Sequence, residues 1–139
     1  MDKLTKIKEY YENNSPFIKY LGIKVIKIGK GYAKTSMDIT KTHHNSIGIA
    51  HGGAIFTLVD ATLGVAALSH GFAVVTTNAN ISYLNPGING PLVAEAKEIN
   101  RSKKLGVYEV KVIDNENTIV AVAQGTMYIK RMTYPPEHQ

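Results

Sequence analysis

The chain has 139 residues, of which 44% are hydrophobic and 19% are charged, and this composition is typical of one folded domain rather than a disordered chain. It contains no cysteine, which excludes disulfides, thiolate metal sites and a cysteine nucleophile. Sixteen basic and eleven acidic residues give a net charge of +5, which favours anionic partners such as nucleic acid, anionic lipid or a phosphorylated small molecule.

The N-terminal segment, residues 3–13, predicts a short amphipathic helix, because its apolar side chains recur at helical spacing among Lys and Glu. Residues 13–16 end this helix with a proline, and a second short segment follows at 17–21. The Lys-rich N-terminus has no apolar stretch of the kind that forms a secretory signal, so we expect a cytoplasmic protein.

Two strand-like runs, 23–28 and 32–39, flank a Gly-Lys-Gly turn signal and predict a hairpin. Residues 40–50 show no periodicity and predict a polar loop. His43 and His44 lie in this loop and are expected to be exposed.

The most apolar stretch of the chain, residues 52–68, predicts a helix with a broad apolar face, since small and aliphatic residues repeat at three- and four-residue intervals. His70 and a following glycine end the pattern. Because the stretch is short and is interrupted by Asp60, we interpret it as a buried helix and not as a membrane span.

Four further strands are predicted, separated by short turns: 73–85, 91–101, 105–114 and 118–130. Short connections favour antiparallel neighbours, and a helix that is apolar nearly all round must be wrapped. One antiparallel sheet curled around one central helix satisfies both, which gives an α+β fold. We expect a single domain over 1–139, with the N-terminal helix within 1–15, a frayed tail at 131–139, and a dimer or tetramer that covers the edge strands.

The start of the apolar helix carries two consecutive glycines after His51. Glycine costs about 1 kcal/mol relative to alanine in a helix, so Gly52 and Gly53 do not serve helix stability. They leave backbone N–H groups uncovered at a helix end that already offers unpaired donors and a positive dipole. Such donors suit an oxyanion or a polarised carbonyl oxygen.

Asp60 is an acid inside this apolar helix, where an acid is seldom found unless it is paired or functional. Gly52 and Asp60 are separated by eight residues, or about 12 Å along a helix axis. One helix cannot bring both to the same reacting carbon. If both serve one site, a second copy of the chain must supply one of them, as a two-fold dimer would.

The motif Asn45-x5-His51-Gly52-Gly53-Ala54-x5-Asp60-x3-Gly64 resembles the signature of hotdog-fold acyl-CoA thioesterases of the phenylacetic-acid-degradation subgroup. Residues 76–87 and 120–125 resemble later strands of the same family, so that the resemblance covers roughly 16–130. It implies a hotdog fold and the hydrolysis of an acyl-CoA thioester to a free acid and CoA.

The resemblance also implies a role for each motif position. Asp60 would be the general base that activates water, or else the nucleophile. The Gly52 N–H would polarise the thioester carbonyl, while Asn45 and His51 would shape that oxyanion site. Thr76 would position the water, and the Asp60–Thr76 pair would face Gly52 of the partner subunit.

Coenzyme A is the implied carrier, and its phosphates need cations. The candidates at a predicted strand turn are Arg101, Lys103 and Lys104. The segment expected to lie along the pantetheine arm comprises Tyr83, Asn85, Pro86 and Gly87. No cofactor is implied, because CoA is part of the substrate.

Several alternatives fit the same residues. The loop histidines lack cysteine partners and helical spacing, so no metal site is predicted. Thr76 is also consistent with an ordinary β-branched strand residue, and the basic residues 101–104 are also consistent with a turn that is only solvated. A non-catalytic acyl-CoA-binding module of the same fold is the main alternative function, followed by a dehydratase, while nucleic-acid binding rests on charge alone. Aromatic and medium aliphatic acyl groups both fit.

Overall fold

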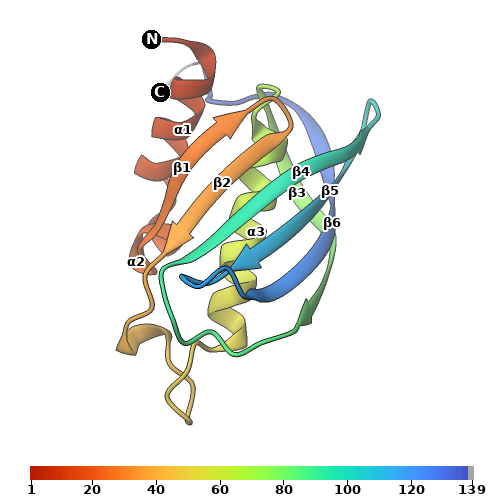
Figure 1. The fold of residues 1–139 in the computed structure, drawn as a ribbon. Helices are drawn as coiled ribbons and strands as arrows, with labels where there is room; N and C mark the ends of the chain where they lie inside the picture. The colour runs from red at the N-terminus through yellow and green to blue at the C-terminus, as the bar shows by residue number, and fades with distance from the viewer. Residues whose placement is uncertain (138–139) are drawn as a thin grey trace.

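A six-stranded antiparallel sheet curls around the long helix α3 (Gly52–Leu68) in the computed structural model, which describes residues 1–137 (Figure 1). The strands are β1 (Ile23–Gly29), β2 (Tyr32–Met37), β3 (Phe72–Tyr83), β4 (Leu92–Arg101), β5 (Leu105–Ile113) and β6 (Ile119–Thr133). Their order in the sheet is β1-β2-β4-β5-β6-β3, and every neighbouring pair is antiparallel. The predicted α+β fold, a sheet wrapped around one helix, is confirmed.

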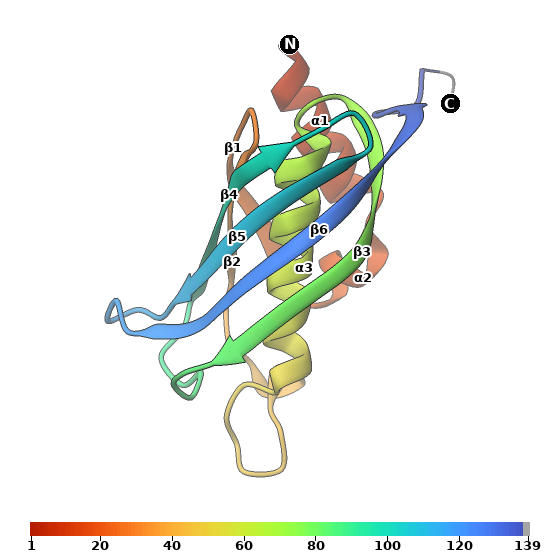
Figure 2. The ribbon, with the colours of Figure 1, turned by 90° about the vertical axis from the view of Figure 1, so that its right-hand side faces the viewer.

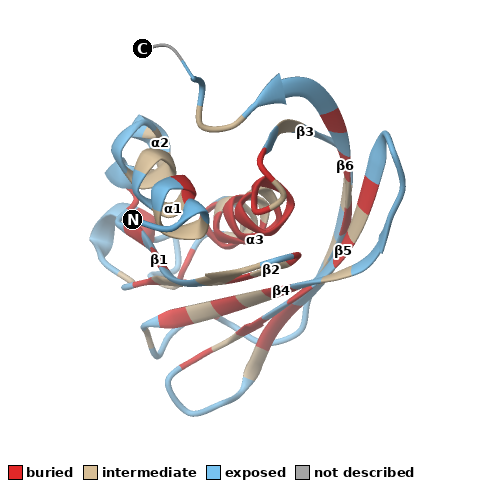
Figure 3. Ribbon diagram, turned by 90° about the horizontal axis from the view of Figure 1, so that it is seen from above, coloured by how far each residue is buried: buried red, intermediate tan, exposed pale blue. Residues whose placement is uncertain are grey.

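The core lies between α3 and the concave face of the sheet (Figure 3). Along β2 and β4 fully buried residues alternate with less buried ones, so that one face of the sheet packs on the helix. Ala33, Ala94 and Ala96 point inward and are fully buried, and their small side chains let α3 lie close to the sheet. The hydroxyl oxygens of Thr35 and Thr62 lie 2.7 Å apart in this core, so both buried hydroxyls have a partner.

Two N-terminal helices lie beside α3 at the open side of the curled sheet (Figure 3). Helix α1 (Lys3–Asn13) has the predicted bounds, and its N-cap residue is Asp2, whose side chain accepts a hydrogen bond from the Thr5 N–H. Helix α2 (Pro16–Tyr20) begins with the proline that ends the α1 pattern. The Glu12 carboxylate accepts a hydrogen bond from the Val25 N–H at 2.9 Å and thereby fastens α1 to β1.

The predicted loop 40–50 is more ordered than expected. It contains a 3₁₀ turn over Lys41–His43 and is closed by an isolated β-bridge between His44 and Ala50. His44 is exposed as predicted, but the prediction for His43 is wrong, because this side chain is only 4% exposed. Its Nδ1 accepts from the Thr40 N–H at 2.9 Å, which leaves Nε2–H to donate to the Leu21 carbonyl at 2.7 Å.

The C-terminal segment is also more ordered than predicted. β6 continues through Thr133, and the Tyr134 N–H then donates to the Gly71 carbonyl at 2.9 Å. The Tyr134 ring packs edge-on against Tyr10 of α1, with ring centroids 5.3 Å apart. The prediction of a frayed tail is therefore wrong at its start, because residues 131–134 are ordered by these contacts. Residues 138–139 of that prediction lie outside the described residues.

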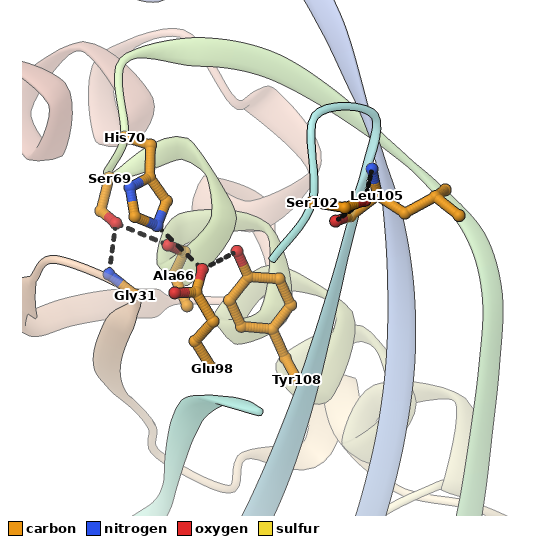
Figure 4. Close-up of polar contacts among 8 residues, drawn as sticks. All are labelled: Gly31, Ala66, Ser69, His70, Glu98, Ser102, Leu105 and Tyr108. Atoms are coloured by element: carbon orange, nitrogen blue, oxygen red, sulfur yellow. Dashed lines mark hydrogen bonds and ion pairs between the residues drawn. The ribbon is translucent and has the colours of Figure 1, made fainter. Parts of the chain in front are cut away.

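The end of α3 is joined to β4 and β5 through Glu98 (Figure 4). Its Oε1 accepts a hydrogen bond from the Tyr108 hydroxyl at 2.7 Å and lies 2.8 Å from His70 Nε2. Burial, followed by the hydrogen bond to Glu98, raises the pKa of the Tyr108 phenol, so the phenol remains a protonated donor at neutral pH. These contacts fix the last turn of α3 relative to the β4–β5 hairpin.

A second contact at this end of α3 runs through Ser69, whose Oγ accepts from the Gly31 N–H at 2.8 Å (Figure 4). We expect Ser69→Ala to lower the free energy of unfolding by about 1–3 kcal/mol, because it leaves that buried N–H without a partner. Urea denaturation measures the loss. Ser102→Ala is the matched control, since Ser102 is exposed and should cost less than about 0.5 kcal/mol. Equal losses in the two variants would contradict the role of Ser69.

No helix in residues 1–137 has both the length and the hydropathy needed to cross a lipid bilayer.

Candidate active site

The start of α3 presents a backbone donor that no other group of the described residues accepts. His51 is the N-cap residue, and its Nδ1 accepts a hydrogen bond from the Gly53 N–H at 2.8 Å. The Gly52 N–H has no hydrogen-bond partner within residues 1–137. It therefore lies free at the positive end of the helix dipole, where a developing negative charge would be stabilised.

Gly52 lines a cavity of about 320 Å³ together with the predicted pantetheine segment. The Tyr83 hydroxyl donates to the Gly52 carbonyl at 2.9 Å, and the Ala50 N–H donates to the Gly87 carbonyl at 2.9 Å. A Cβ at Gly87 would lie only 3.0 Å from Ala50 Cβ, so the absence of a side chain permits this close approach. The structure thus brings the helix start and the segment 83–87 of the same chain to one place.

Asn45 supports the loop that precedes the helix. Its Oδ1 accepts hydrogen bonds from the Ile47 N–H at 3.0 Å and the Ile49 N–H at 3.2 Å. The loop that it closes projects beyond the N-terminal end of α3 (Figure 2). The side-chain oxygen of Asn45 is therefore occupied within its own loop, and its contribution is to shape the chain that leads into His51.

Asp60 and Thr76 form the second part of the candidate site. The Thr76 hydroxyl donates to Asp60 Oδ1 at 2.7 Å and is 3.4 Å from the sulfur of Met127. The β3–β6 register shifts between Thr76 and Asn78, and such a bulge redirects side chains locally. The pair opens onto a groove of about 530 Å³ between α3, β3 and the N-terminal helices.

Tyr11 of α1 lines the same groove and was not identified from the sequence as a site residue. Burial raises the pKa of the Tyr11 phenol, and the negative charge of Asp60 raises it further, so the phenol is protonated at neutral pH. Only the packing of α1 against α3 brings it here, and the helical spacing of Tyr11 predicted a packing role alone.

The two parts of the site do not meet within one chain. Gly52 and Asp60 are eight residues apart on the straight helix α3, which corresponds to about 12 Å along its axis. Tyr83 contacts the first part and Thr76 belongs to the second, and both come from β3. Figure 2 shows β3 as the outermost strand of the sheet, beside β6. Both parts therefore lie along a sheet edge that is free to pair.

The predicted basic residues line a separate cavity of about 490 Å³. Its cationic lining consists of Arg101, Lys103, Lys104, Lys130 and Arg131. The last two come from β6 and were missed, because only the pairing of β5 with β6 places them beside the β4–β5 turn. None of these cations forms an ion pair with a carboxylate of residues 1–137, so an anionic ligand would meet unneutralised charge.

The described residues contain no group of three or more His, Asp or Glu side chains arranged to hold a metal ion. The ring nitrogens of His43 bond the backbone and Thr40, and Nδ1 of His51 bonds the backbone.

Comparison with known proteins identifies the family. The family model described as "Thioesterase superfamily" matches residues 47–121, which is more than half of the chain. The acyl-coenzyme A thioesterase PaaI of Escherichia coli K12 is 34% identical over 116 residues, covering 83% of this chain and 82% of PaaI.

Solved structures agree with the sequence comparison. The E. coli PaaI protein, from the phenylacetic acid degradation operon, matches with a TM-score of 0.91 at 30% identity, over 94% of this chain and 96% of that one. The smu.793 protein of Streptococcus mutans UA159, solved bound to acetyl CoA, matches with a TM-score of 0.74 at 30% identity, over 78% of this chain and 88% of that one. The chain therefore belongs to the thioesterase superfamily, as a hotdog-fold thioester hydrolase of the group that includes PaaI.

Proposed function

We propose that the protein is an acyl-CoA thioesterase whose active site is shared between two copies of the chain. One copy would supply Asp60 and Thr76, and the other would supply the Gly52 N–H. The observation that carries the proposal is the pairing of a carboxylate with a hydroxyl at 2.7 Å on one part of the β3 edge and an unused helix-start donor on the other.

Pairing of β3 with a second copy would complete the site. β3 is a long edge strand, and exposed edges of this kind are normally covered. Pairing of two antiparallel β3 strands about a two-fold axis between Thr76 and Tyr83 would place the Asp60–Thr76 pair beside Gly52 of the partner subunit. Two such sites would form in each dimer, and a tetramer would contain two dimers.

The reaction would proceed by addition of water to the thioester carbonyl. Asp60 would accept a proton from the water that Thr76 positions, and the hydroxide would add to the carbonyl carbon. The Gly52 N–H of the partner subunit would donate to the oxyanion. The C–S bond would then break, and the CoA thiolate would take the proton back from Asp60. In the second form of the mechanism, Asp60 attacks the carbonyl carbon itself and the C–S bond breaks to release the CoA thiolate. Water then hydrolyses the resulting mixed anhydride to the free acid and Asp60, and the thiolate takes up the proton that is set free. Neither form uses a cofactor.

The remaining predicted residues are assigned to CoA. The pantetheine arm would lie along the segment 83–87, and the phosphates would bind in the basic cavity lined by Arg101, Lys103 and Lys104 together with the two β6 cations.

We expect the double variant Lys103→Ala/Lys104→Ala to raise KM for an acyl-CoA about tenfold with kcat nearly unchanged, because charge-assisted bonds to phosphate hold substrate and transition state equally. Steady-state kinetics measure this. The matching acyl-pantetheine thioester lacks the nucleotide, so its KM should be the same for the variant and the wild type. The control Lys24→Ala/Lys27→Ala removes two exposed charges from β1. A similar rise in KM in the control would contradict a specific phosphate site.

Thiol release from acyl-CoA esters, read with a thiol-reactive dye, tests the proposed function. The panel contains acetyl, butyryl, octanoyl, palmitoyl, phenylacetyl and benzoyl esters. The chain has no cysteine, so the protein gives no background signal. Release by the wild type is expected. Tight binding of esters without release would reject the thioesterase and favour a non-catalytic acyl-CoA-binding module.

A further inference from the structure

The groove beside Asp60 contains a glycine whose missing side chain leaves open space. We propose that the acyl group of the substrate lies over Gly64 in this groove, and that Gly64 sets the size of acyl group that the enzyme accepts. The acyl class would be unbranched aliphatic chains of medium length and flat aryl groups. This inference rests on the proposed function, because it takes Asp60 to be the residue at the reacting carbonyl.

Gly64 is unusual because the packing of the protein does not require it. Glycine is unfavourable in the interior of a helix, and Gly64 lies well inside α3. A glycine inside a helix or strand can be explained by a neighbour that leaves no room, as at Gly125 of β6, where a Cβ would lie 2.5 Å from Leu63 Cδ1. A Cβ at Gly64, in contrast, would meet no atom within 4 Å. The open space is therefore available to a ligand.

That space is continuous with the Asp60–Thr76 pair. Asp60, Gly64 and Leu68 follow one another at four-residue intervals on one face of α3, and all three line the groove. They form a floor about 12 Å long. The polar pair lies at one end of this floor, and Leu68 lies at the other.

The walls of the groove are mostly apolar and fit an acyl chain, and Tyr11 and Ser15 are the polar residues that line it besides Asp60 and Thr76. Phe17 and Ile18 of α2 lie on one side, and Val74 and Val75 of β3 lie on the other. A thioester carbonyl at Asp60 would place the carbon chain between these walls and above Gly64. A side chain at position 64, about 6 Å along the helix axis from Asp60, would occupy the volume that carbons several bonds beyond the carbonyl need. A bulky branch on the substrate would need more of that volume than the groove offers.

The test compares Gly64→Ala and Gly64→Leu with the wild type on acetyl-, octanoyl- and phenylacetyl-CoA. Gly64→Leu should lower the ratio of kcat/KM for octanoyl-CoA to that for acetyl-CoA at least about tenfold, since a few methylene groups carry effects of this size. Gly64→Ala should lower it less and should raise Tm by about 4 °C, because alanine favours the helix and meets no neighbour. Gly29→Ala, which adds the same methyl group outside the groove, should leave the ratio unchanged.

A binding measurement separates this inference from the proposed function. Calorimetry with the uncleavable thioethers S-ethyl-CoA and S-octyl-CoA should show the same loss of preference for the longer chain in Gly64→Leu. This binding measurement tests the role of Gly64 even if the wild type hydrolyses no ester. In that case the proposed function would be rejected, and the inference about Gly64 would still be tested by binding. A folded Gly64→Leu protein with an unchanged preference would overturn the inference. If such a variant also changed its state of association, the groove would be assigned to contact with the second copy.

Discussion

Asp60→Asn is expected to lower kcat by about 10²- to 10⁴-fold, the size of effect that a positioned general base contributes. Asn has nearly the same shape as Asp, and its amide oxygen can still accept the Thr76 hydrogen bond. It cannot accept a proton from water or attack the carbonyl as a carboxylate. Steady-state thiol release with the best ester of the panel measures the loss.

The fold should survive this change, because Asp60 is only partly buried and forms no ion pair with the other residues of the described chain. Tm and the state of association of Asp60→Asn should match those of the wild type. Thr76→Val is the companion variant and should lose less activity, since it removes only the hydroxyl that positions the water. An Asp60→Asn enzyme that keeps half of its activity would remove Asp60 from the mechanism.

The helices and strands could be predicted from local patterns, because the spacing of apolar residues in each segment matches the period of the element that the segment forms. The bounds of α1 are those predicted, and the strand predicted at 118–130 extends over Ile119–Thr133. The strand order could not be read in the same way. β3 pairs with β6 at the edge of the sheet, and this pairing joins residues that are far apart in the sequence, as Phe72 and Thr133 are.

The candidate site was predictable where it follows the chain and unpredictable where it depends on register. Gly52 and Asp60 belong to one helix, which His51 caps, and β3 follows it along the chain, so the motif itself indicated a site. The burial of His43 depends on bonds from both ring nitrogens, one to Thr40 and one to the distant Leu21 carbonyl. Nothing in the local pattern of residues 40–50 distinguishes a histidine that bonds such a carbonyl from a solvated one.

The β6 cations and Tyr11 show the same limit of local patterns. Lys130 and Arg131 reach the basic cavity because Leu105 pairs with Tyr128. Alternation along β6 predicts which residues share a face, but not which turn lies next to that face. Tyr11 reaches the groove because α1 packs against α3, and the Glu12 contact with β1 helps to hold α1 in place. In both cases the missing information is a tertiary contact.

Gly52→Pro is expected to lower kcat by about 10²- to 10³-fold, because it deletes the one N–H that would bind the oxyanion. Proline suits the first position of a helix, where no intrahelical bond is lost, and His51 has the extended backbone (ψ 139°) that a following proline requires. Gly52→Ala is the matched control. Alanine places a Cβ at the same position, 3.4 Å from the Tyr83 ring, but keeps the N–H. Gly52→Ala should therefore lose far less activity than Gly52→Pro.

Mixing this variant with Asp60→Asn tests whether the site is shared between two chains. In a dimer of one Gly52→Pro chain and one Asp60→Asn chain, one site would contain an intact Asp60 from the first chain and an intact Gly52 from the second. Random co-assembly in equal amounts should restore about a quarter of wild-type activity from two nearly inactive proteins, since half of the dimers are mixed and each holds one intact site. If both groups acted within a single chain, mixing would restore nothing. Recovery in the mixture therefore separates the shared site from a single-chain site, which kinetics of either variant alone cannot do.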